Sequence, residues 1–155
     1  MEHLYHPIAL TGLLAIAAWL DARSRKLPNW LAGAILLVGI IQIAFLGDWA
    51  NIGWHFAHGG IALVIGMILF AIGWVGGGDA KTYAALAVSF PLAHALPLLG
   101  TVSIAMLILA VFWIAVHRWK RRRAGQSKPK SKDDFAKIPL GVAIAAGGII
   151  QLWPL

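Results

Sequence analysis

Long uninterrupted runs of apolar residues constrain the fold of this chain more than any other feature. A helix needs roughly 20 residues, at about 1.5 Å per residue, to cross about 30 Å of hydrocarbon. Hydrophobic residues make up 60% of the sequence and charged residues 12%, whereas soluble domains have roughly 45–50% and 25%. We therefore predict an all-α, polytopic integral membrane protein. Its clear spans are Leu4–Leu20, Trp30–Leu46, Phe56–Val75, Leu98–Trp119 and Ile138–Trp153.

A further apolar block, Ala80–Leu96, contains Pro91 and is followed by Pro97, so it fits either a short crossing or a re-entrant segment. The positive-inside rule favours a crossing. If the block crosses, all 13 Lys and Arg residues fall on one side of the membrane, which is then the cytoplasmic side. We predict about six transmembrane helices in one domain, residues 1–155, in the plasma (inner) membrane, with both termini outside.

One stretch, at about residues 118–137, has the composition of a polar loop. It combines most of the basic residues with Gly125, Ser127 and Pro129. We expect a cytoplasmic loop that binds anionic lipid headgroups, since each Lys or Arg near the surface contributes about 1 kcal/mol. Nucleic-acid binding is not expected, because lipid and topology already account for the charge. The chain has no cysteine, which excludes disulfides, thiolate metal sites and cysteine nucleophiles.

Two of the six acidic residues stand directly beside predicted spans. Asp21 follows Trp19-Leu20, and Asp79 follows three consecutive glycines. Either one alone could be a polar residue that merely ends a span, because span ends tolerate acids. In the six-span topology, however, both lie at the same face and depth. Two carboxyls placed together can share one proton, as in aspartic proteases, so we predict a catalytic pair.

Three consecutive glycines precede Asp79, at Gly76, Gly77 and Gly78. They predict either backbone dihedrals that are closed to other residues, with a close approach of another chain, or a simple loop that ends a helix.

Local electrostatics suggests which aspartate of the pair holds the proton. Asp79 begins a helix and has Lys81 nearby, so we expect it to ionise first, and Asp21, at a helix end, to keep the shared proton.

These residues resemble a known family, the prepilin peptidases (type IV prepilin leader peptidases). The run Gly76-Gly77-Gly78-Asp79-Ala80-Lys81 resembles that family's GxGD signature. Asp21 with Arg23, followed by Leu27-Pro28-Asn29, is similar to the family's first catalytic aspartate and the opening of its next span. Pro139-Leu140-Gly141 is similar to a C-terminal family segment, although Leu140 stands where an aromatic residue is usual.

The resemblance implies a membrane aspartic endopeptidase that acts at the cytoplasmic face. It would remove a short N-terminal leader from prepilin or pseudopilin substrates whose hydrophobic helix is still in the membrane. The resemblance also implies catalytic residues Asp21 and Asp79, an active-site loop of Gly76, Gly77, Gly78 and Lys81, and supporting residues Arg23, Pro28 and Asn29. No cofactor or metal is implied. Because the paired cysteines of the long bifunctional members are absent, the chain looks like the short, single-activity branch associated with tight-adherence (Flp) pili.

Two other interpretations use the same aspartates. A non-enzymatic membrane subunit or carrier would use them to bind cations or protons, and it predicts acids near the bilayer midplane rather than at span ends. An intramembrane protease of the presenilin or signal-peptide-peptidase type shares the GxGD chemistry. That type expects a Tyr-Asp pair within a span, where this chain has Leu20-Asp21.

Overall fold

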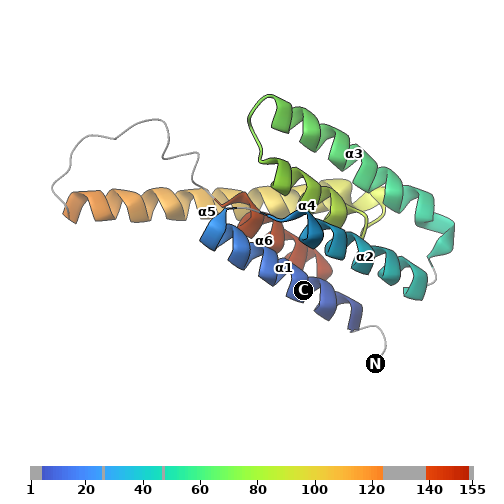
Figure 1. Cartoon of the computed structure of the whole chain (residues 1–155). Coiled ribbons are helices and arrows are strands. Elements are labelled where there is room, and N and C mark those ends of the chain that lie inside the picture. Colours follow the sequence, from blue (N-terminus) through green and yellow to red (C-terminus); the bar gives the residue numbers. More distant parts are fainter. Residues whose placement is uncertain (1–4, 26, 47, 124–138, 154–155) are drawn as a thin grey trace.

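A computed structural model describes residues 5–25, 27–46, 48–123 and 139–153. Every element in these ranges is helical and none of the described residues lies in a strand, so the predicted all-α fold is confirmed (Figure 1). In chain order the elements are α1 (Tyr5–Ser24), α2 (Asn29–Leu46), η2 (Trp49–Asn51), α3 (Ile52–Ala71), α4 (Gly77–Ala87), η3 (Leu92–His94), α5 (Ala95–Arg123) and α6 (Leu140–Leu152), where η denotes a short 3₁₀ helix.

Within the described ranges, three helical segments are long and apolar enough to cross a membrane, namely Asn29–Leu46, Trp49–Ala71 and Leu92–Val116. Helix α6 is apolar but shorter. Large apolar side chains, such as those of Phe45, Val64 and Leu107, are exposed on the outer faces of these helices. An apolar outer surface is what lipid requires as a solvent, and the membrane fold predicted from composition is confirmed.

Helix α6 packs between α1 and α5, and α4 packs against α2, α3 and α6. Small residues set these distances. A Cβ atom added to Gly147 would lie 2.6 Å from the backbone of Val102, so α5 and α6 approach each other closely only because glycine is there. At the other side of α6, the Trp153 indole N–H donates to Thr11 Oγ1 of α1 at 3.2 Å.

Helix α4 is shorter than the predicted crossing Ala80–Leu96, because it has only 11 residues and is therefore about 16 Å long. Two histidines of α3 meet the chain where α4 ends. His55 Nδ1 is hydrogen-bonded to the Val88 carbonyl at 2.9 Å, and His58 Nδ1 to the Phe90 carbonyl at 3.0 Å. The chain after α4 thus returns to the first turns of α3, and α5 starts from there.

Helix α5 continues to Arg123, so residues 118–123 are helical and not part of a loop as predicted. The remainder of the predicted basic loop, 124–137, lies outside the described residues. Helix α5 extends well beyond the other helices at one end of the bundle (Figure 1). At that end the Arg25 guanidinium, just after α1, lies 5.8 Å from the centre of the Trp113 ring of α5. We call this the aspartate end, and the opposite end, where α3 and α5 begin, the far end.

Candidate active site

Asp21 lies in the last turns of α1 and is only 5% exposed. Its carboxylate accepts hydrogen bonds from another helix: the Gly141 N–H donates to Asp21 Oδ2 at 2.7 Å, and the Val142 N–H also donates to it. Because Pro139 precedes α6, these N–H groups belong to the first turn, where they have no partner within their own helix. Asp21 therefore caps α6, whose positive dipole end favours an anion.

Asp79 is the third residue of α4, and Gly76 is the N-cap of that helix. The Gly76 N–H donates to the Asp79 carboxyl. This is one half of a capping box, in which an acid at the third helical position reaches back to the N-cap N–H. Asp79 is half-buried. Like Asp21, it is held by a backbone N–H group at the beginning of a helix.

The two carboxyls interact, and both lie outside the segments identified as membrane-spanning. Burial, reinforced by the charge of Asp21, raises the pKa of Asp79 to about 6, against the effect of the Gly76 N–H. Burial also raises the pKa of Asp21, while the N–H groups of Gly141 and Val142 and the charge of Arg25 lower it. The backbone N–H groups and Arg25 thus favour the charged form of Asp21, whereas burial and the charge of Asp21 favour the protonated form of Asp79.

This proton assignment is the reverse of the one predicted from the sequence. That prediction weighed only the local helix ends, which favour a charge on Asp79. The groups that stabilise a charge on Asp21 come from α6, and Gly141 is 120 residues away along the chain. Gly141 was noted in a C-terminal motif without a role at the site, and its proximity to Asp21 appears only in the fold.

Close approach explains the glycines before Asp79 better than unusual dihedrals do. A Cβ atom on Gly78 would lie 3.1 Å from both the Cβ and the carbonyl oxygen of Leu27, in the α1–α2 connection. Among the described residues, the glycine with a positive φ is Gly73, at 79°, in the turn after α3. The structure thus shows a close approach within the chain, from Leu27, and no positive φ at positions 76–78, while the approach of another chain stays a prediction.

The other residues predicted for the site have partners other than the two carboxyls. Lys81 Nζ donates to Asn29 Oδ1 at 3.1 Å, which joins the first turns of α4 and α2. The Pro28 carbonyl accepts from the Leu31 N–H at 3.1 Å at the start of α2. The Arg23 guanidinium lies 5.4 Å from the centre of the Trp19 ring. The groups that shift the pKa of Asp79 are Asp21 and Gly76, together with burial, and Lys81 is not among them.

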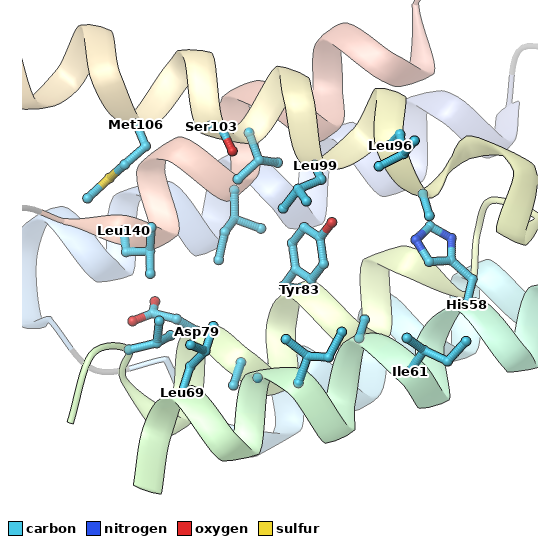
Figure 2. A pocket seen from close by; sticks show the side chains of 18 of the residues that line it. His58, Ile61, Leu69, Asp79, Tyr83, Leu96, Leu99, Ser103, Met106 and Leu140 are labelled. Atoms are coloured by element: carbon cyan, nitrogen blue, oxygen red, sulfur yellow. The ribbon is translucent and has the colours of Figure 1, made fainter. Parts of the chain in front are cut away.

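Asp79 also lines a groove of about 510 Å³ between α3, α4, α5 and α6. Figure 2 shows Asp79 and Leu140 at one end of the groove, His58 and Leu96 at the other, and Tyr83 between them. Its lining is mostly aliphatic. In the part of the chain that the structure describes, no group of three or more His, Asp or Glu side chains is placed to hold a metal ion.

Apolar helices that bring two interacting carboxyls to one end of a bundle define a membrane-embedded protein with paired acids. The sequence model of the type IV leader peptidase family matches residues 8–114, which include both Asp21 and Asp79. The chain belongs to this family, and it is a peptidase. Neither a curated protein nor a solved structure matches the chain.

Proposed function

We propose that this protein is an aspartic endopeptidase that removes the short N-terminal leader of prepilin-like substrates. One observation carries the proposal. Asp21 and Asp79 come from different helices, yet the charge of Asp21 raises the pKa of Asp79. Each carboxyl also accepts a hydrogen bond from a backbone N–H group at the start of a helix. Two interacting carboxyls that are partly withdrawn from water favour a state with a single negative charge, as a peptide-hydrolysing dyad requires.

In the proposed reaction, the Asp21 carboxylate takes a proton from water while the water oxygen attacks the carbonyl carbon of the peptide. The protonated Asp79 donates a hydrogen bond to the carbonyl oxygen and stabilises the charge that develops on it. The C–N bond of the tetrahedral intermediate then breaks, and the leaving amine takes a proton from the pair. The dyad ends with one proton, as it began.

The distribution of charge supports a cytoplasmic location for this chemistry, in the plasma (inner) membrane. The aspartate end of the bundle carries Arg23, Arg25 and Lys81 as well as the dyad. The basic residues of α5 belong to its last turns, which lie at the same end. Short basic segments next to spans remain in the cytoplasm. The dyad would therefore meet the leader on the cytoplasmic side, where water is available.

The test is the processing of a pilin precursor co-expressed with variants of the protein. Asp21→Asn and Asp79→Asn should each lower the cleavage rate by at least about 10²–10⁴-fold, the usual contribution of general acid–base catalysis. Asp48→Asn is the matched control, because Asp48 lies at the far end, bonded to His55 and Asn51. It should process normally.

Cleavage would be measured by electrophoresis and N-terminal sequencing of the product, in membranes that contain equal amounts of each variant. A chelator should leave the wild-type rate unchanged. Near-normal processing by either dyad variant, or failure of the wild type to cut precursors with a short leader, would refute the proposed function.

A further inference from the structure

The groove beside the dyad has walls from α3 and α5 and a floor from α4 and α6 (Figure 2). Its wall residues are apolar and open to the surroundings. Ile65 of α3 is 52% exposed, and Leu96 and Leu99 of α5 are 80% and 51% exposed. In a membrane, such a groove is reached sideways from the lipid, and a guest can enter it without passing through water.

Polar groups along the groove are few. His58, at the far end, already bonds to the Phe90 carbonyl through Nδ1. Among the described residues that line the groove, Tyr83 and Ser103 supply the only other polar side chains between His58 and Asp79. A polar or charged guest would lose its hydration here without gaining partners. The groove therefore suits an apolar guest along most of its length.

The direction of the groove follows that of the helices. On α3 its lining extends from Leu69, near Asp79, to His58 at the far end. At about 1.5 Å per residue these 11 helical steps span about 16 Å, roughly three turns of a helix. Helix α3 is itself a candidate span, so a guest lying along it crosses the membrane in the same direction.

Building on the proposed function, we propose that this groove binds the hydrophobic helix that follows the scissile bond of the substrate. The newly formed N-terminus of that helix would lie at Asp79 and its third turn near His58. The continuity of the groove with Asp79 favours a peptide over lipid, because a chain leaving the carboxyl has an apolar path of the right length and direction. A lipid acyl chain would gain nothing from the carboxyl.

Site-specific photo-crosslinking tests this register. The inactive Asp21→Asn variant would carry a photoreactive residue at Met106, near the aspartate end of the groove, or at Leu96, at its far end, and would be expressed with a full-length pilin precursor. Met106 should crosslink to the first residues after the cleavage point, and Leu96 to residues about ten positions further along the helix. The control is Leu107, which is 65% exposed on α5 and does not line the groove.

Equal crosslinking from Leu107, the same substrate residues captured from both groove positions, or capture of lipid alone would overturn the groove assignment. A matched pair of substitutions gives a second readout. Ile65→Trp fills the groove and should slow precursor cleavage by about tenfold, a loss of about 1.4 kcal/mol. Val64→Trp, on an exposed face of α3 outside the groove, should process like the wild type. Normal cleavage by Ile65→Trp would count against the assignment.

These outcomes separate the two proposals. If the wild type cleaves the precursor but the crosslinks and the tryptophan pair contradict the groove, the peptidase assignment stands and the groove assignment fails. If the wild type does not cleave the precursor, the proposed function itself fails.

Discussion

At the scale of single residues, the dyad depends on backbone N–H groups as well as on its carboxyls. The Gly141 N–H holds Asp21 at 2.7 Å, and the Gly76 N–H holds Asp79. Both N–H groups belong to the starts of helices, where the backbone has no internal partner. Two helix starts therefore fix the orientation of the carboxyls, and each of these positions is occupied by glycine, which leaves room for the acid.

Gly141→Ala tests this dependence. The added Cβ would lie 2.8 Å from Asp21 Oδ2 and 2.9 Å from Asp21 Cβ, so the carboxylate must move. A displacement of this kind can cost about 10²-fold in rate, and we expect kcat to fall by about 10–100-fold. Gly33→Ala, whose Cβ would have no neighbour within 4 Å, should match the wild type. Equal kcat values for Gly141→Ala and Gly33→Ala would contradict the positioning role.

The pH dependence of kcat/KM follows from the proton assignment. The pKa of Asp79 is raised to about 6, so activity of the free enzyme should fall above that pH, as Asp79 loses the shared proton. It should also fall at acidic pH, as Asp21 gains a proton. Since the charge of Arg25 lowers the pKa of Asp21, Arg25→Gln should move the acidic limb to higher pH.

Lys81→Met provides the control for Arg25→Gln. The sequence alone predicted that Lys81, close to Asp79, helps that carboxyl to ionise, but Lys81 bonds to Asn29 instead. We now expect both limbs to stay in place. Initial rates of precursor cleavage across the pH range would show the difference. An acidic limb moved by Lys81→Met and unmoved by Arg25→Gln would restore the earlier prediction.

At the scale of helices, small residues place α4 against α3 and thereby set the position of Asp79. A Cβ atom on Gly66 would lie 2.9 Å from the Cβ and 3.3 Å from the Cα of Ala80, the neighbour of Asp79. Gly60, in the same helix, has nothing within 4 Å of such an atom. These two positions allow the same substitution to be compared at a packed and an open place.

Gly66→Val should destabilise the detergent-solubilised protein by about 1–3 kcal/mol, the usual cost of overpacking, and should also slow cleavage. Gly60→Val adds the same side chain without the contact and should change little. Thermal unfolding of the two variants would measure the difference. If both unfold at the same temperature, the close packing of α3 on α4 contributes nothing to stability.

The sequence predicted some helices better than others, for a physical reason. Helices α2 and α3 correspond closely to the predicted spans Trp30–Leu46 and Phe56–Val75. A helix in contact with lipid can be predicted from its apolar composition alone. Helix α4 faces protein instead. The chain just after α4 is held by His55 and His58, which bond to the Val88 and Phe90 carbonyls, and no local pattern encodes such contacts.

At the scale of the whole molecule, the helices bring two acids and several basic residues to one end. The sequence predicted that Asp21 and Asp79 would share one face from the parity of the spans, and their electrostatic interaction agrees with it. It did not predict the part played by α6, because nothing in the chain links Gly141 to Asp21 except the fold. Long-range contacts of this kind lower the pKa of Asp21 and so favour its charged form.

Labelling with a membrane-impermeant thiol reagent tests the orientation of the bundle. The chain has no cysteine, so single cysteines report without background. Ala93→Cys, exposed at the far end, should react in intact cells, whereas Ser24→Cys, exposed at the aspartate end, should react only after permeabilisation. The reverse pattern would place the dyad outside the cytoplasm.

The most direct test of the dyad is an infrared titration of the Asp79 carboxyl in the purified protein, with Asp79→Asn as the spectral blank. In the wild type the carboxyl should lose its proton at a pKa of about 6. In Asp21→Asn its pKa should fall, because the neighbouring charge is gone, yet stay above the ordinary value for aspartate, because burial remains. An identical pKa in the two proteins would show that Asp21 and Asp79 do not form a pair, and would contradict the proposed mechanism.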